Sequence, residues 1–258
     1  HDLDLLDQMT APTVKDVTII LRPSVIGRTI DTYHDYNEGS ILRVGSYTGW
    51  ARTGSGILGL FNIHSSEAST IVSLMDFPGI HDDSHGYYII RAHTNGKVSA
   101  RMRPIDQDSL VSIVLEQRGW EILTAYPTQS FTLNVNQRAH DSVDRLAHVA
   151  VLGLLGKMTG AAAVVTSDII LAENGRLRFD ISLKALGTVG IYLSDLPDRS
   201  IARDFMVMIQ GRPIPQKTVW KEGGKDGNVL AIDVLTAWKM MKLDSGWSNE
   251  VFVQVFVG

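Results

Sequence analysis

The stretch from Leu146 to Leu171, LAHVAVLGLLGKMTGAAAVVTSDIIL, constrains the fold more than any other part of the sequence. It holds two apolar runs, Val149–Leu155 and Ala161–Val165, which Gly156–Gly160 separates like a turn. A short apolar run between turn residues is typical of a strand buried on both faces or of a buried helix segment. The many β-branched residues and the flanking glycines favour strands. We therefore predict two core strands, or one long strand broken at Lys157, in the centre of a sheet.

Composition excludes several classes of protein. The chain has 258 residues, 44% of them hydrophobic and 20% charged, which is ordinary for a globular protein with a full core. The net charge of −4 comes without a Lys/Arg cluster, so no nucleic-acid partner is expected. A membrane span needs about 20 uninterrupted apolar residues, and neither run approaches that length. Cysteine and Asn-X-Ser/Thr acceptors are absent, which slightly favours the cytoplasm without fixing the compartment.

Strand patterns fill most of the chain outside the central stretch. Leu177–Leu183 and Val251–Val257 alternate between two faces, and Asn95-Gly96 is a strong hairpin signal between 87–93 and 97–103. We expect 110–115 to pair with 120–126, and a charged linker over 134–145. The remaining strands are expected at 18–21, 40–47, 56–63, 70–75, 131–133, 187–193, 205–210, 218–220 and 229–235. The pattern predicts an all-β fold, an antiparallel β-sandwich of two packed sheets with about a dozen strands.

Helical patterns are rare. HDLDLLDQMTAP at the start has Leu3, Leu6 and Met9 on one face, and Pro12 would stop a helix there. No signal peptide follows His1, and a helix entered partway suggests a piece of a longer protein. The pattern of 238–241 fits a strand or a helical turn equally well.

Five segments occur in the order and spacing of one known group of enzymes. They are HDLDLL at His1, LRPSVIGR at Leu21, GILGLFN at Gly56, GWEILTAYP at Gly119 and VLGLLGKMTGAAAV at Val151. In this order they resemble the C-terminal region of the raffinose synthase and seed imbibition proteins, which belong with the α-galactosidases of glycoside hydrolase family 36. The sequence departs from that pattern at Leu3, where an aromatic residue is usual, and at Lys157–Gly160.

The resemblance implies two domains with different roles. Residues 1–38 would be the end of a (β/α)₈ barrel domain and a connection, and 39–258 a C-terminal β-sandwich domain. The catalytic carboxylate pair of such enzymes lies at the C-terminal ends of barrel strands, which would precede His1. The chain would thus be a non-catalytic fragment whose partners are that barrel and, through it, galactoside sugars. We expect no cofactor, no catalytic residue and no membrane contact.

The motifs that could carry a cofactor or a metal are weak. Gly54–Gly59 fits the G-x-G-x-x-G dinucleotide pattern, but the residues after it predict a strand where that site needs a helix. The loop with His81, Asp82, Asp83 and His85 could hold a cation, although polar loops of this kind are usually solvated turns. We therefore expect no nucleotide site and regard the loop as a weak metal candidate.

Acid/base chemistry would need carboxylates at a defined separation, and turn capping is the favoured role for each candidate: Asp76, Asp168, Asp195 and Asp204. Arg22, Arg28 and Asp31 lie in the connection that the resemblance places near a catalytic face. They could contact sugar hydroxyls, although an interdomain ion pair is the favoured alternative.

Tryptophan supplies a second possible function. Trp120, Trp220 and Trp238 are expected in the core, whereas Trp50 and Trp247 lie in glycine-containing loops and are expected to be exposed. Exposed tryptophans could stack on sugars in a free-standing carbohydrate-binding module. A third possible function is that of an oligomeric jelly-roll scaffold, which is supported only by analogy of fold.

Overall fold

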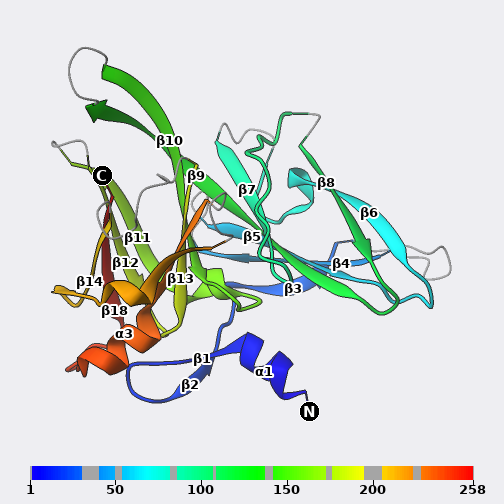
Figure 1. Cartoon of the computed structure of the whole chain (residues 1–258). Coiled ribbons are helices and arrows are strands. Elements are labelled where there is room, and N and C mark those ends of the chain that lie inside the picture. The colour runs from blue at the N-terminus through cyan, green and yellow to red at the C-terminus, as the bar shows by residue number, and fades with distance from the viewer. Residues whose placement is uncertain are drawn as a thin grey trace. The chain divides into compact units, whose positions relative to one another are not determined.

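The computed structural model describes residues 2–30, 41–49, 54–81, 86–106, 109–136, 142–172, 176–194, 205–222 and 228–257. The chain divides into two compact units, the first made of His1–Leu21 and Gln129–Gly258 and the second of Arg22–Thr128 (Figure 1). This division crosses the predicted boundary at residue 38. The assignment of 1–38 to a barrel and of 39–258 to one domain stays a prediction.

Two antiparallel sheets build the first unit. One follows the order β16-β17-β13-β10-β9, and the other β11-β12-β18-β14-β15. The strands of the first are β16 (Val219–Glu222), β17 (Val229–Asp233), β13 (Thr188–Leu193), β10 (Ser142–Leu154) and β9 (Trp120–Asn136). Those of the second are β11 (Val164–Leu171), β12 (Leu177–Leu183), β18 (Val251–Val257), β14 (Phe205–Ile209) and β15 (Arg212–Pro213).

Alternation along the strands explains the core between these sheets. In β12 the residues Leu177, Phe179, Ile181 and Leu183 are all fully buried, while the side chains between them are partly exposed. They pack with the buried residues of β18 and with Val189 and Ile191 from the facing sheet. Because successive strand residues point to opposite faces, one face of each sheet is apolar and meets the other sheet.

The N-terminal segment of the first unit is short and held by hydrogen bonds. Helix α1 (Leu3–Met9) is followed by β1 (Thr10–Pro12), which pairs with β2 (Thr18–Ile20). The Asp2 side chain caps the helix by accepting from the Asp4 and Leu5 amides. Lys157 donates to the Asp7 carbonyl at 2.6 Å and lies 3.2 Å from its carboxylate. The segment is thereby tied to the turn after β10.

The second unit is a smaller sandwich. Its main sheet runs β9-β5-β4-β3, with β7 paired to β9, and β6 and β8 form a separate two-stranded sheet. The strands are β3 (Val25–Thr29), β4 (Leu42–Thr48), β5 (Ser55–Phe61), β6 (Ala68–Ser73), β7 (Tyr87–Ala92) and β8 (Leu110–Leu115), with a 3-10 turn η1 (Leu74–Asp76) after β6. Leu58, Leu60 and Phe77 are among the residues of its buried core. β9 begins in this unit and continues into the first.

The predicted all-β antiparallel sandwich is confirmed, with eighteen strands in the residues that the structure describes. The prediction for the central stretch is confirmed only for β10, which lies inside its sheet. The second run begins as a 3-10 turn, η2 (Gly160–Ala163), and β11 is an edge strand, so a place in the centre of a sheet is wrong there. Its alanines are small enough to bury as a turn instead of spanning the core.

Two predicted connections are also wrong, and a third forms only in part. β8 pairs with β6, and β9 with β5 and β7, so 110–115 and 120–126 are not partners. The predicted linker over 134–145 lies partly within β9 and β10, because both strands extend beyond the body of the sheet as a paired ribbon. The Asn95-Gly96 turn forms, but 97–103 returns with isolated bridges only, at Val98 and Met102.

The undecided segment 238–241 is helical. It completes α3 (Val234–Met241), whose first turn is capped by the Asp233 carboxylate accepting from the Thr236 amide at 2.9 Å. Among the described residues, no helix has the length and apolar character needed to cross a membrane.

Candidate functional site

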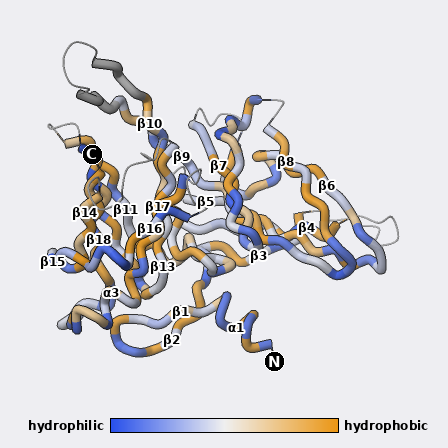
Figure 2. The backbone as a smooth tube through the Cα atoms, in the orientation of Figure 1, coloured by the Kyte–Doolittle hydropathy of each residue, from blue (hydrophilic) through white to orange (hydrophobic). Residues whose placement is uncertain are grey.

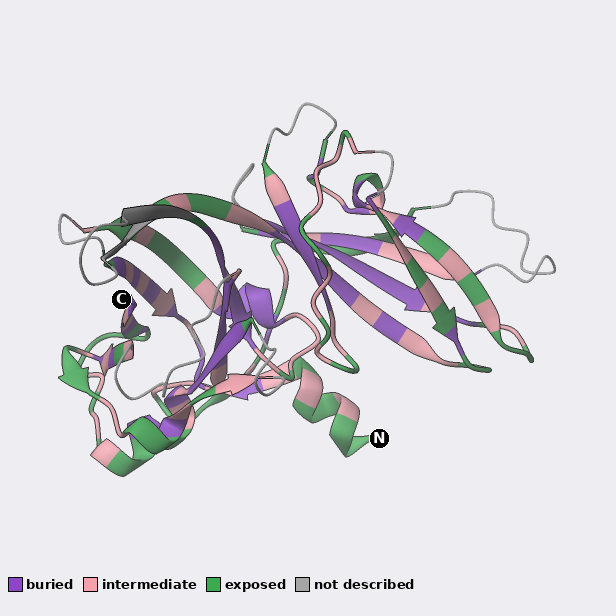
Figure 3. Cartoon of the chain, turned by 45° about the horizontal axis from the view of Figure 1, so that its top comes forward, coloured by how far each residue is buried: buried purple, intermediate pink, exposed green. Residues whose placement is uncertain are grey.

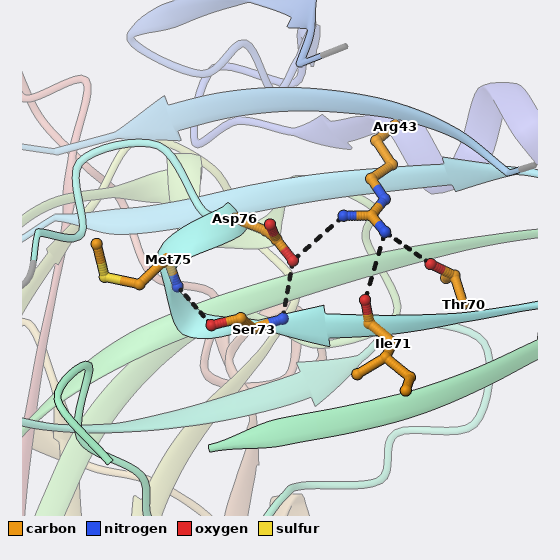
Figure 4. Close-up of polar contacts among 6 residues, drawn as sticks. All are labelled: Arg43, Thr70, Ile71, Ser73, Met75 and Asp76. Atoms are coloured by element: carbon orange, nitrogen blue, oxygen red, sulfur yellow. Dashed lines mark hydrogen bonds and ion pairs between the residues drawn. The ribbon is translucent and has the colours of Figure 1, made fainter. Parts of the chain in front are cut away.

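The carboxylate of Asp76 belongs to a polar cluster that joins two strands of the second unit (Figure 4). The Arg43 guanidinium from β4 lies 3.3 Å from the Asp76 carboxylate and donates to the Thr70 hydroxyl at 2.8 Å and the Ile71 carbonyl at 3.4 Å, both in β6. Asp76 also accepts from the Ser73 amide at 2.8 Å. Its roles are to close the 3-10 turn and to tie β6 to β4, as the turn-capping prediction requires.

Asp168 was predicted to cap a turn, but it does not lie in a turn. It lies within β11, directly opposite Asp180 of β12, so turn capping is wrong for this residue. The Asp180 carboxylate accepts from the Arg178 guanidinium at 2.9 Å and from the Gln254 amide at 2.9 Å. The other two candidate carboxylates, Asp195 and Asp204, lie outside the described residues.

The glycine-rich pattern Gly54–Gly59 leads into strand β5 rather than a helix, as expected from the sequence. A Cβ on Gly54 would lie 2.3 Å from the Thr48 carbonyl oxygen, and one on Gly56 would lie 2.8 Å from the Phe77 Cβ. These glycines are therefore needed for close packing, and the helix N-terminus that a dinucleotide requires does not follow them.

The candidate metal loop can be followed only at its first residue. His81 is exposed, while Asp82, Asp83 and His85 lie outside the described residues. Within the ranges that the structure describes, no group of three or more His, Asp or Glu side chains is placed to hold a metal ion.

The arginines of the predicted connection are both exposed. Arg22 precedes β3, and Arg28 lies within β3, opposite Gly45 of β4. No strand was predicted in this connection, so β3 is a correction. Asp31 is outside the described residues, and sugar contact by the two arginines stays a prediction.

Trp247 is fully exposed, at 102% of its reference area, as its glycine-containing loop predicts. Lys15 reaches this loop and donates to the Gly246 carbonyl at 2.5 Å. Trp238 is buried at 8% exposure, whereas Trp220 is 40% exposed, so its assignment to the core is wrong. Trp120 stacks on His93 with ring centroids 5.8 Å apart. Trp50 lies outside the described residues.

Two buried polar residues have no signal in the sequence. Glu121 is 5% exposed and accepts from the backbone amides of His93, Thr94 and Ile122 at 2.9–3.0 Å. His148 is 1% exposed, and its Nδ1 lies 2.9 Å from the exposed Ser130 hydroxyl in the neighbouring strand. Each lies between two apolar neighbours in its strand, and only the folded structure reveals its partners.

Tyr126 gives the second unit a predicted sensitivity to alkali. Burial raises the pKa of Tyr126 from its ordinary value of 10.0 to about 12, although the charge of Arg91 and a hydrogen bond with Thr124 lower it. Between pH 10 and pH 12 the unfolded chain therefore loses this proton while the folded protein keeps it, and the free energy of unfolding falls. The contribution lost across this interval is about 3 kcal/mol.

The measurement is urea unfolding at a series of pH values. Tyr126→Phe should show a smaller loss of stability between pH 10 and pH 12 than the unmodified protein, since the other tyrosines and lysines titrate alike in both proteins. Equal losses would show that Tyr126 ionises as easily in the folded protein as in the unfolded chain.

Comparison with known proteins gives little similarity. No family model matches the sequence, and no curated protein matches it. Among solved structures, a Bacillus halodurans protein described as an alpha-N-acetylgalactosaminidase aligns with a TM-score of 0.31 and 18% identity, over 42% of this chain and 21% of its own. The chain thus spans about a fifth of that structure's length and is weakly similar to part of a glycosidase.

Proposed function

We propose that this chain is a non-catalytic β-sandwich portion of a glycoside hydrolase or galactosyltransferase that acts on α-galactosides. Its role would be to pack on a catalytic barrel and stabilise it, with the reactive carboxylates in the barrel. The five ordered segments that resemble the raffinose synthase group support the substrate class.

The observation that carries this proposal is the exposed apolar face of α1. Leu3, Leu6 and Met9 are 75%, 53% and 44% exposed, and the helix has no buried residue (Figures 2 and 3). A helix of seven residues is unstable alone in water. Here its cap and the contacts of Lys157 hold it in place. Its exposed apolar face could therefore pack against the surface of the proposed barrel.

The next segment also exposes apolar side chains. Val17, which precedes β2, is 56% exposed, and Ile20 within β2 is 58% exposed. Exposed apolar patches are a common mark of a protein interface. Docking of a barrel on α1 and β2 would remove these side chains from water and add stability to both partners.

The test is Leu6→Asp in the product of the complete coding sequence, with Leu110→Asp as the matched control. Leu110 is also half exposed, at 50%, but lies on β8 of the second unit. Leu6→Asp should lower the stability of the catalytic portion by about 2 kcal/mol or more, because a carboxylate would be buried without a partner. The thermal midpoint of galactosidase activity reports this loss.

The same variant in the isolated 258-residue chain should be nearly neutral, since Leu6 is exposed there. If Leu6→Asp and Leu110→Asp lower the midpoint equally in the complete product, the docking role of α1 is wrong.

The exposure of Trp247 favours a second candidate, a free-standing carbohydrate-binding module. A glycan array would then show binding that Trp247→Ala abolishes and Trp238→Phe, a change at a buried position, leaves in place. Binding that survives Trp247→Ala would exclude this residue as the sugar platform.

A further inference from the structure

We infer that the outer face of the five-stranded sheet β11-β12-β18-β14-β15 is a carbohydrate-binding surface. The inference concerns a site separate from α1 and from Trp247. It holds whether or not the chain packs on a barrel, so it can fail without affecting the proposed function.

Strand register defines this face. Residues opposite one another in adjacent strands share a face, and the inward residues of β12 and β18 fill the core. Three rows of side chains remain on the outside. They are Thr166–Ser182–Phe252, then Asp168–Asp180–Gln254–Met208, then Ile170–Arg178–Phe256–Met206.

The outer rows are unusually apolar for the solvent side of a sheet. Phe252 is 38% exposed, Ile170 41% and Met206 48%. Phe252 and Phe256 are four residues apart on β18, which separates them by about 13 Å along the strand. The two rings can therefore offer two stacking positions on one face of the sheet, with Gln254 between them.

The middle row contains an arrangement that costs stability. Asp168 and Asp180 are directly opposite, so their Cβ atoms are about 5 Å apart and two like charges face each other. Arg178 and Gln254 each bind the Asp180 carboxylate at 2.9 Å, but Asp168 is exposed on the edge strand. Unfavourable local pairs that persist in a stable sheet are found mainly at functional sites.

Arg178 adds a second unfavourable feature. Its side chain is 41% exposed, yet its Nε atom is buried and has no hydrogen-bond partner within the part of the chain that the structure describes. A small movement of the guanidinium toward an acceptor on the sheet face would remove this cost.

A sugar satisfies all of these groups at once. Each hydroxyl both donates and accepts, so one ring can donate to Asp168 and accept from Arg178 while its apolar face lies on a phenylalanine. A metal cation would suit the carboxylates and repel Arg178, and an anion would meet two negative charges. An apolar protein surface would leave Asp168 buried without a partner. A neutral polyhydroxylated ligand is the chemistry that fits.

The test is affinity electrophoresis of the 258-residue protein in gels cast with galactomannan, xylan or laminarin, together with saturation-transfer NMR with raffinose. We expect binding to at least one of these probes. Phe252→Ala and the isosteric Gln254→Met should each weaken it about tenfold or more, which corresponds to the loss of one good contact. Ile71→Ala and Leu110→Ala, at 59% and 50% exposed positions on β6 and β8, are the controls and should bind normally.

Asp168→Asn distinguishes a binding role from a structural one. It removes the like-charge pair, so the thermal midpoint should rise or stay unchanged while sugar binding weakens. The inference is overturned if none of the four probes binds, if Phe252→Ala and Gln254→Met bind as well as the controls, or if Trp247→Ala alone abolishes binding.

Discussion

Gly160→Ala should unfold the first unit or destabilise it by more than about 4 kcal/mol, among the largest effects expected of a single substitution. A Cβ on Gly160 would lie 1.8 Å from the Leu154 carbonyl oxygen, and one on Gly153 would lie 2.3 Å from the Gly160 carbonyl oxygen. Both obstacles are backbone atoms, which cannot turn aside as a flexible side chain can. The two glycines allow the end of β10, at Gly153 and Leu154, to lie against the backbone of Gly160 at close distance.

Urea unfolding followed by circular dichroism measures this effect, with Gly156→Ala as the matched control. Gly156 lies in the same turn with a φ of +72°, but no atom of the described residues is within 4 Å of the position of its Cβ. Alanine there should cost only about 1–2 kcal/mol for the left-handed backbone. A similar loss in the free energy of unfolding for the two variants would show that the backbone around Gly160 can move to accommodate the added methyl group.

Glu121→Ala should destabilise the second unit by about 3–5 kcal/mol. The carboxylate of this buried residue accepts from three backbone amides and from the Thr94 hydroxyl. Its removal leaves buried donors without partners, and each costs about 1–3 kcal/mol, part of which water entering the cavity would recover. The turn after β7 would lose its anchor to β9.

Glu121→Gln separates these hydrogen bonds from the volume of the side chain. Glutamine keeps one acceptor oxygen at nearly the same place, so we expect a cost of about 1 kcal/mol. Thermal unfolding of both variants is the measurement. A glutamine variant as unstable as the alanine variant would show that the charge of the carboxylate, rather than its acceptor positions, stabilises the turn.

Local pattern was enough to predict individual strands. The alternation in Leu177–Leu183 and Val251–Val257 fixes which residues face the core, and the structure confirms it. The start of helix α3 was missed because Val229–Leu235 was predicted as one strand. The change from strand to helix depends on Asp233 capping the Thr236 amide.

Pairing and sites could not be predicted in the same way. β8 pairs with β6 across 110–115 and 68–73, and nothing in either segment specifies its distant partner. The opposition of Asp168 and Asp180 depends on the register of one hairpin, which the sequence leaves open. The function of Asp76 could be predicted, because a capping contact lies within a few residues.

The most direct test is turnover of p-nitrophenyl α-D-galactopyranoside by the purified 258-residue chain and by the product of the complete coding sequence. We expect the complete product to release nitrophenol and the chain alone to release none, because the proposed function places the reactive carboxylates in the barrel. Turnover by the chain alone that Asp168→Asn or another single Asp→Asn change abolishes would contradict it, because the reactive carboxylates would then lie within these residues.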